Sequence, residues 1–183
     1  MRKLIMWNLI TLDGFFEGLE PWSLDFHMTA WGEELQAMSD EQAAATGMLL
    51  FGRKTYDGMM GYWTSADADA NIAAYMNGAP KALFSRTRKE GPWENTQLVS
   101  ADAVADVAKL KAQPGKDLFV FGSAELSAPL LEAGLFDELR VCVCPVVLGA
   151  GTPLFKPGAR KNLTLTRTQP LQTGGVILRY QPA

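Results

Sequence analysis

The chain alternates between short apolar runs and longer segments in which apolar residues recur at helical spacing. Short apolar runs bounded by turn residues are typical of buried strands, and recurrence every third or fourth residue is typical of amphipathic helices. The pattern predicts strands at 2–10, 48–51, 79–84, 97–99, 116–121 and 137–144, and helices at 29–46, from 54 onward, 67–77, 102–111 and 124–133. A hairpin of 163–173 and 176–181, turning at Gly174-Gly175, ends the chain.

Strands that alternate with helices predict an α/β fold. We expect a mostly parallel sheet with an antiparallel edge and helices on both faces. The 183 residues are 48% hydrophobic, which is enough for one domain with a sizeable core, and no repeat or linker divides residues 1–183.

Composition narrows the classes of partner. The net charge of −3 and the lack of a basic run argue against nucleic acid as the main partner. No segment is long and apolar enough to span a membrane. The N-terminal stretch lacks a small-residue cleavage site and contains Asn8, so it is interpreted as a first strand rather than a signal peptide, and a cytoplasmic location is expected.

The sequence offers little for metal or thiol chemistry. Cys142 and Cys144 lie two apart in one predicted strand, where they share a face and are badly placed to bond each other. The only histidine, His27, is remote from them in sequence, so no metal site is expected.

Residues 48–61 contain a strand that passes into a helix through Gly52. Free N–H groups and the dipole of a helix start attract phosphate. Arg53 and Lys54 add positive charge there, and Thr55 adds a hydroxyl donor. This arrangement is a plausible cradle for a phosphorylated cofactor, although many such junctions serve only as tight turns.

A second junction follows the same pattern. Gly122 ends the strand 116–121, and Ser123 is a good candidate for the N-cap of the next helix. Two such junctions in one sheet can serve one extended ligand, such as a dinucleotide.

Two further loops are candidates. Ser85, Arg86, Thr87 and Arg88 follow a predicted strand, where ligands bind in open α/β sheets, and can hold a terminal phosphate; a solvated surface loop is the alternative. The aromatic-rich loop 15–22 is either a lid over a flat ring or a plug for the core.

These motifs, taken in order, resemble the dihydrofolate reductase-like family, and most closely the branch of the reductase domain of bifunctional riboflavin-biosynthesis deaminase-reductases. The resemblance covers nearly the whole chain. It rests on the segments 11–15, 51–56, 83–87, 120–123 and 145–151. The last segment favours the riboflavin branch over true folate reductases.

The resemblance implies the three-layer dihydrofolate reductase-like fold, NADPH as cofactor and hydride transfer. It places Gly52, Arg53, Lys54 and Thr55 at cofactor phosphates, Ser85 and Arg86 at the adenosine end with its 2′-phosphate, Gly122, Ser123, Ala124 and Glu125 around the pyrophosphate, and Thr11, Gly14 and Phe15 against the nicotinamide.

The substrate side departs from the folate reductases. These carry a Pro-Trp-x-Leu followed three residues later by a carboxylate, and here residues 21–24 match but His27 stands at that position. Asp13 and Asp25 are therefore the candidates for a catalytic or substrate-binding carboxylate. Partial burial by Trp22 and Phe26 would raise the pKa of such a group; a turn residue (Asp13) or a cap or solvated charge (Asp25) is the alternative.

The leading hypothesis is an NADPH-dependent reductase acting on a small heterocyclic substrate, and the resemblance suggests a pyrimidine-phosphoribosyl intermediate of riboflavin biosynthesis. The alternatives are a nucleotide- or flavin-binding protein without turnover and a true dihydrofolate reductase. The apolar segment 141–155 predicts a homodimer, because burial against a second copy would cover it.

Overall fold

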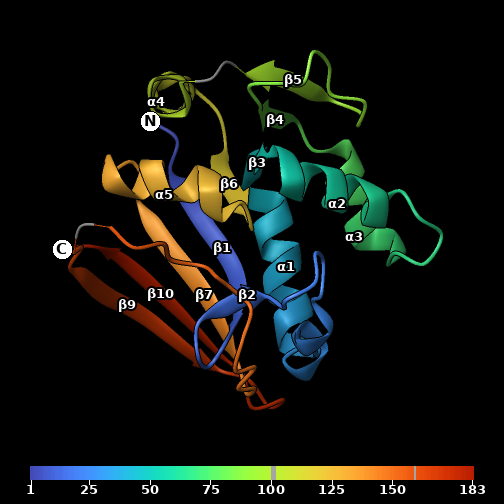
Figure 1. Cartoon of the computed structure of the whole chain (residues 1–183), viewed down its shortest axis with the longest axis vertical. Coiled ribbons are helices and arrows are strands. Elements are labelled where there is room, and N and C mark those ends of the chain that lie inside the picture. Colours follow the sequence, from blue (N-terminus) through green and yellow to red (C-terminus); the bar gives the residue numbers. More distant parts are fainter. Residues whose placement is uncertain (100–101, 159) are drawn as a thin grey trace.

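Strand β1 (Leu4–Thr11) runs through an eight-stranded sheet and pairs in parallel with strands on both sides. The computed structural model describes residues 1–99, 102–158 and 160–183 (Figure 1). The other strands are β2 (Phe15–Glu17), β3 (Thr46–Gly52), β4 (Lys81–Phe84), β5 (Thr96–Val99), β6 (Asp117–Phe121), β7 (Glu138–Cys144), β8 (Thr152–Pro153), β9 (Leu163–Pro170) and β10 (Val176–Pro182). The helices are η1 (Asp25–Thr29, 3-10), α1 (Glu33–Ala45), α2 (Arg53–Trp63), α3 (Ala70–Gly78), α4 (Ala103–Ala112) and α5 (Ala124–Glu132).

The strand order is β5-β4-β3-β6-β1-β7-β10-β9, and β2 pairs separately with β8. All neighbours from β5 to β7 are parallel, whereas β10 is antiparallel to both β7 and β9. The predicted α/β fold with a parallel sheet and an antiparallel terminal hairpin is therefore confirmed. Because the strands from β3 to β7 run the same way, their carboxyl ends meet at one edge of the sheet.

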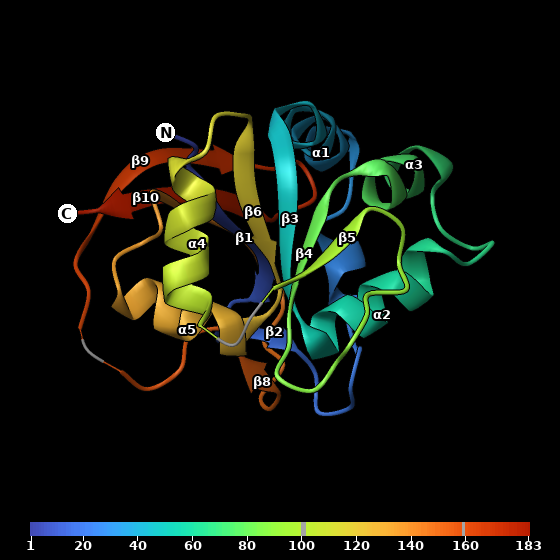
Figure 2. The same ribbon diagram turned by 90° about the horizontal axis from the view of Figure 1, so that it is seen from above.

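Two apolar cores flank the sheet. On one face, Leu35 of α1, Tyr56 of α2 and Met76 of α3 are buried together. On the other, residues of α4 and α5, including Val107 and Leu130, pack on the alternate side chains of the same strands. Figure 2 shows this division, with α4 and α5 on the opposite side of the sheet from α1 and α3. Helices on both faces explain why β1 is almost uniformly apolar.

The helix predicted at 29–46 is two elements. The 3-10 turn of η1 ends where the hydroxyl of Thr29 donates to the carbonyl of Phe26, 2.7 Å away. Gly32 is then fully extended, and α1 begins only at Glu33. Trp31 consequently lies in the connection rather than on the helix face on which Leu35 and Met38 are buried.

The apolar segment 141–155 is covered only in part within the chain itself. Val141, Cys142, Cys144 and Leu154 are buried, and Val147 is the most exposed of the large hydrophobic side chains in this segment, at 68%. The homodimer stays a prediction, and it concerns the exposed part of this segment. The predicted loop 15–22 also contributes to this region, since β2 pairs with β8.

Three features concern the cysteines, the potential metal ligands and the hydropathy of the helices. Both cysteines are buried and free. No cluster of three potential metal-ligating side chains occurs among the residues that the structure describes. Within those same ranges, no helix has the length and hydropathy required to cross a bilayer.

Candidate functional site

The carboxyl edge of the sheet gathers the loops singled out in the sequence. The segments after β1, β3, β4 and β6 are residues 11–15, 52–55, 85–88 and 122–125, and the parallel order of these strands brings them to one side of the molecule. The structure therefore brings together all thirteen residues predicted to bind the cofactor: Thr11, Gly14, Phe15, Gly52, Arg53, Lys54, Thr55, Ser85, Arg86, Gly122, Ser123, Ala124 and Glu125.

The β3–α2 junction has ordinary backbone geometry. Gly52 is extended, with φ of −75°, and no side chain caps the N–H groups of the first turn of α2. Arg53 and Lys54 are exposed beside these groups. A helix start with free donors and two adjacent cations is suited to an anion.

The β6–α5 junction is unusual, because Gly122 and Ser123 both lie in the left-handed region, with φ of 56° and 54°. The prediction that the hydroxyl of Ser123 caps α5 is wrong. Ser123 stands at the N-cap position, but its hydroxyl bonds no N–H group of α5. Its Oγ accepts a hydrogen bond from the N–H of Gly52 at 3.1 Å instead.

The two junctions brace each other. Besides the bond from Gly52 to Ser123 Oγ, the N–H of Ser123 donates to Thr55 Oγ1 at 3.0 Å. Each junction thus supplies a hydroxyl to a backbone N–H of the other. Gly122 is packed so closely here that a Cβ on it would lie 2.9 Å from the methyl group of Thr55. The two helix starts are therefore bonded to each other rather than being two separate turns.

Asn8 is a site residue that sequence reasoning missed. Its side chain is buried on β1, and Oδ1 accepts a hydrogen bond from the N–H of Gly122 at 2.8 Å. Its Nδ2 is buried without a hydrogen-bond partner among the described residues. The available signal was a single amide side chain within the apolar run of β1.

The 85–88 loop is tied to α2 through charge. Ser85 Oγ accepts hydrogen bonds from the N–H groups of Thr87 (3.3 Å) and Arg88 (3.0 Å), so this hydroxyl shapes the turn. Arg88 contacts Asp57 at 2.6 Å, and Arg53 reaches the same carboxylate at 3.6 Å. Arg86 is exposed and forms no ion pair within the part of the chain that the structure describes. It is the cation of this loop that is free to meet a ligand.

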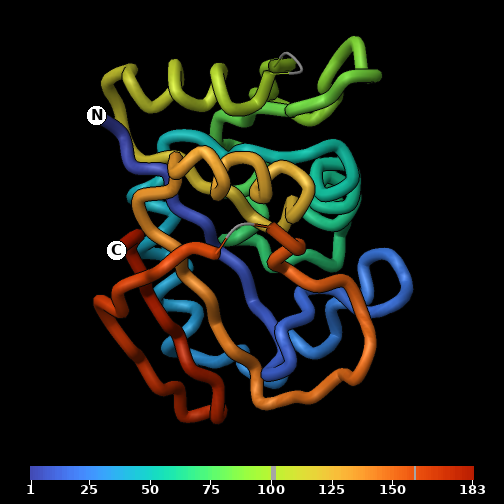
Figure 3. The backbone as a smooth tube through the Cα atoms, turned by 60° about the vertical axis from the view of Figure 1, so that its left-hand side comes forward, coloured from blue at the N-terminus to red at the C-terminus, as the bar shows by residue number. Residues whose placement is uncertain are grey.

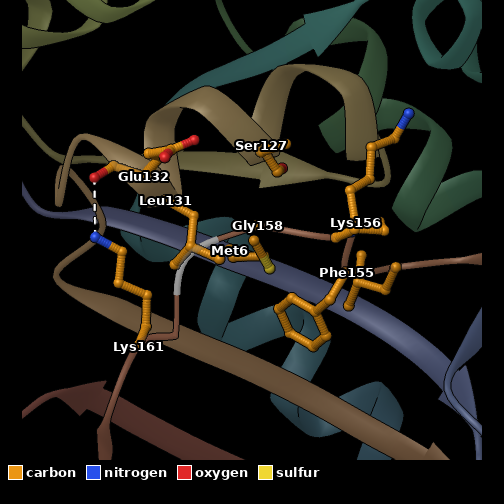
Figure 4. A pocket seen from close by; sticks show the side chains of 11 residues that line it. Met6, Ser127, Leu131, Glu132, Phe155, Lys156, Gly158 and Lys161 are labelled. Atoms are coloured by element: carbon orange, nitrogen blue, oxygen red, sulfur yellow. Dashed lines mark hydrogen bonds between the residues drawn. The ribbon is translucent and has the colours of Figure 1, made fainter.

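Glu125 brings a negative charge to the first turn of α5. The segment after β7 returns from the carboxyl edge to this helix, as the tube in Figure 3 shows. Lys156 of that segment forms an ion pair with Glu125, and Lys161 donates to the carbonyl of Glu132, 2.9 Å away, at the end of the helix (Figure 4). Between these two attachments lies a small cavity of about 60 Å³ lined by Met6, Ser127, Ala128, Leu131, Glu132, Leu154, Phe155, Lys156, Pro157, Gly158 and Lys161. Lys156 therefore supplies the cation that the sequence of this junction lacks.

Asp13, one of the two candidate carboxylates, accepts hydrogen bonds that favour its ionised form. Its carboxylate accepts hydrogen bonds from Thr11 Oγ1 (2.6 Å) and from the N–H groups of Leu148 (3.1 Å) and Gly149 (2.7 Å). The hydroxyl of Thr11, together with these N–H groups, lowers the pKa of Asp13 to about 2. The ionised carboxylate joins the 11–15 loop to the 145–151 loop, and this arrangement favours a positioning role for Asp13 over a role as proton donor.

Asp25 does not meet the expectation of partial burial. It is exposed on η1, and the ring of Trp22 packs against Gly58 of α2. The neighbouring His27 is half-buried. Burial lowers its pKa to about 4, so the imidazole is neutral near pH 7, and its Nε2 has no hydrogen-bond partner among the described residues.

Comparison with known proteins connects this geometry with a family. Residues 2–177 match the RibD C-terminal domain. The uncharacterised Bacillus subtilis protein YyaP is 31% identical, over 98% of this chain and 94% of its own. A Thermotoga maritima diaminohydroxyphosphoribosylaminopyrimidine deaminase/5-amino-6-(5-phosphoribosylamino)uracil reductase has a TM-score of 0.69 at 10% identity, covering 100% of this chain and 57% of that one. Enterococcus faecalis dihydrofolate reductase, complexed with NADP(H), has a TM-score of 0.68 at 13% identity, covering 98% and 96%. The predicted dihydrofolate reductase-like fold is confirmed.

Proposed function

The chain belongs to the RibD C-terminal domain family, and on this premise we propose that it is a reductase that uses NADPH to transfer a hydride to a small heterocyclic substrate. Family membership supports a reductase-type role. The observation that carries the choice of cofactor is the mutual bracing of the two helix starts through Gly52, Thr55 and Ser123. Two fixed N–H-rich ends, side by side, suit a ligand with several phosphates.

The residues at this edge fit such a cofactor in shape and charge. Gly122 carries no side chain, and the methyl group of Thr55 fills the space that a Cβ would take, so this junction packs closely against the first turn of α2. Asn8 holds the N–H of Gly122 and has a donor to spare. When bound, NADPH would supply the hydride, and the chain would supply position and electrostatics.

Arg86 is the residue that we assign to the choice between NADPH and NADH. It is exposed at the end of β4, next to a turn that Ser85 and the Arg88–Asp57 ion pair hold in place. A guanidinium binds the extra 2′-phosphate through charge-assisted hydrogen bonds. Lys54 and Arg53, on the neighbouring helix start, add to the positive field.

The substrate proposal is a pyrimidine bearing a phosphoribosyl group, as in the name of the Thermotoga maritima neighbour. Asp13 is ionised and His27 is neutral near pH 7, so neither group offers an acidic proton there. We assign to Asp13 the positioning of the 11–15 loop, where the nicotinamide would lie. The neutral imidazole of His27 also separates this site from one that anchors a folate through a carboxylate.

Turnover is the test of the function. The purified protein is mixed with NADPH and, in separate reactions, with 5-amino-6-(5-phosphoribosylamino)uracil, with dihydrofolate and with no substrate, and loss of absorbance at the reduced nicotinamide band is followed. We expect NADPH to be oxidised only in the reaction that contains the pyrimidine. The rate should fall in Arg86→Ala. It should be unchanged in Arg160→Ala, which removes the same charge outside the site. Turnover of dihydrofolate instead would replace the substrate proposal, and tight NADPH binding without turnover of any heterocycle would favour a nucleotide-binding protein.

Self-association remains part of the proposal as a homodimer. Val147 and Phe155, exposed at 68% and 46%, are the apolar side chains of the 141–155 segment that a second copy would cover. A molecular mass of one chain by light scattering at micromolar concentration would refute it.

A further inference from the structure

Three arginines face one another across the strands at the far edge of the sheet. Arg179 of β10 lies directly opposite Arg140 of β7 and directly opposite Arg167 of β9. In antiparallel pairs, residues that lie opposite each other point to the same face, with their Cβ atoms about 5 Å apart. Arg140 lies on the face that α1 covers, since it contacts Gln42 of that helix, whereas Arg167 on the edge strand is exposed.

Only one of the three is neutralised. Arg140 donates to Glu138 at 2.5 Å and to Gln42 at 3.2 Å, and its guanidinium lies over the ring of Phe119. Within the described ranges, the side chains of Arg167 and Arg179 form neither an ion pair nor a hydrogen bond, and Nε of Arg179 is buried without a partner.

Such a row is costly for the fold. Like charges directly opposite each other destabilise a strand pair, and a buried N–H without an acceptor loses its hydration. Burial, followed by the charge of Arg140, lowers the pKa of Arg179, with Arg167 acting the same way and Glu138 and Glu41 opposing. These two carboxylates compensate only part of three positive charges.

The backbone holds this arrangement in place. The pairing of β10 with β9 shifts by one residue immediately after Arg179, and the hydroxyl of Thr166 donates to the carbonyl of Arg179 at 3.0 Å. A bulge of this kind re-aims the side chains beside it. The row is also separate from the cofactor edge, because Arg140 precedes the end of β7 by four residues, about 13 Å of strand.

We propose that Arg167 and Arg179, backed by Arg140, form a second anion site that binds a phosphate-class dianion, either inorganic phosphate or the phosphate group of a small monoester. One dianion neutralises both unpaired guanidiniums, and the planar forks of arginine match its oxygen atoms. The buried Nε–H of Arg179 gains an acceptor at the same time. The site stands independently of the proposed reductase function.

The test is nuclear magnetic resonance of the arginine Nε–H groups, with Arg179 assigned from Arg179→Lys. Inorganic phosphate and, separately, ribose 5-phosphate are titrated against chloride of equal ionic strength. We expect saturable shifts of the Arg179 signal with phosphate but not with chloride. Equal affinities would indicate that the phosphate alone is recognised, and tighter binding of the ester would indicate a phosphorylated metabolite.

Two variants keep the proposal falsifiable. Arg167→Gln should weaken phosphate binding about tenfold or more, as expected for the loss of a charge-assisted contact. It should also raise the melting temperature in chloride, because like-charge repulsion is relieved, and lose that advantage in phosphate. Arg160→Gln should change neither. An Arg179 signal that phosphate leaves unmoved, or an affinity that Arg167→Gln does not alter, would overturn the assignment.

Discussion

The two strand–glycine–helix junctions have the same sequence pattern but different structures. After β3, Gly52 is extended and α2 starts in ordinary geometry with Arg53 and Lys54 alongside. After β6, Gly122 and Ser123 both turn left-handed, and the helix starts with an acid rather than a base. The first junction carries its own charge, whereas the second carries the backbone strain and borrows its charge from Lys156.

The difference shows which properties of a phosphate cradle are local. Gly52 could be another residue without steric conflict, because the atom nearest to an added Cβ lies 3.8 Å away. Gly122 has no such freedom, since its φ is positive and Thr55 is in the way. Strained backbone of this kind persists only where the surroundings hold it, and here the surroundings are the other junction.

The largest expected effect comes from substituting each glycine by alanine. Gly122→Ala should lower the free energy of unfolding by about 2–3 kcal/mol, through left-handed strain and the clash with Thr55. Gly52→Ala, the matched control, should be neutral or stabilise by up to about 1 kcal/mol, because it restricts the unfolded chain. Urea denaturation of both variants measures this. Equal losses would mean that the two junctions are equivalent after all.

The two hydrogen bonds between the junctions should contribute less to the free energy of unfolding than Gly122 does. Ser123→Ala removes the acceptor of the Gly52 N–H and should lower the free energy of unfolding by about 1 kcal/mol. Thr55→Val removes the acceptor of the Ser123 N–H. Because the two bonds support one geometry, the double variant should lose less than the sum of the single losses. Strict additivity in the denaturation midpoints would show that the bonds act separately.

Charge at the second junction should tune cofactor affinity. Glu125→Gln should tighten NADPH binding about threefold at low salt, and Lys156→Met should weaken it by a similar factor, since both charges lie at a partly exposed helix start. Lys161→Met, at the other end of α5, is the control and should change little. Fluorescence titration at two salt concentrations measures the effect. Tighter binding by Lys156→Met would place the pyrophosphate elsewhere.

The smallest effect concerns the 11–15 loop, which the carboxylate of Asp13 holds in place. The native pKa of Asp13 lies at about 2, below its ordinary 3.8, so its contribution to stability is present above pH 3.8 and is lost as the pH falls towards 2. Asp13→Asn should therefore flatten the dependence of stability on pH in that window. Acid denaturation curves of both proteins measure the slope, and identical slopes would contradict the lowered pKa.

The sequence could predict features that depend on neighbouring residues, but not those that depend on contacts between residues far apart in the chain. The elements and both junctions were visible because apolar runs and the glycines that end them are local signals. Ser123 satisfied the local rule for an N-cap, but its hydroxyl bonds Gly52, which is 71 residues away in the chain. Asp13 satisfied the rule for a turn residue, and its pKa depends partly on N–H groups 135 and 136 residues onward. Such contacts exist only once the sheet is assembled.

Two other features of the structure have local causes that are visible in the sequence. The break before α1 lies at Gly32, a residue that favours leaving a helix. The sequence shows Asn8 as a polar residue within the apolar strand β1, but only the structure shows that its side chain accepts a hydrogen bond from the N–H of Gly122. The unpaired arginines of β9 and β10 gave no signal, because their alignment depends on the register across the bulge.

The most direct test of the account is the affinity of the protein for NADPH against NADH, followed by nicotinamide fluorescence at low salt. We expect NADPH to bind at least about tenfold more tightly, as one charge-assisted contact to a phosphate allows. Arg86→Ala should remove most of that preference, and Arg160→Ala should leave it intact. Equal affinities, or binding of neither nucleotide, would contradict the assignment of the carboxyl edge as an NADPH site.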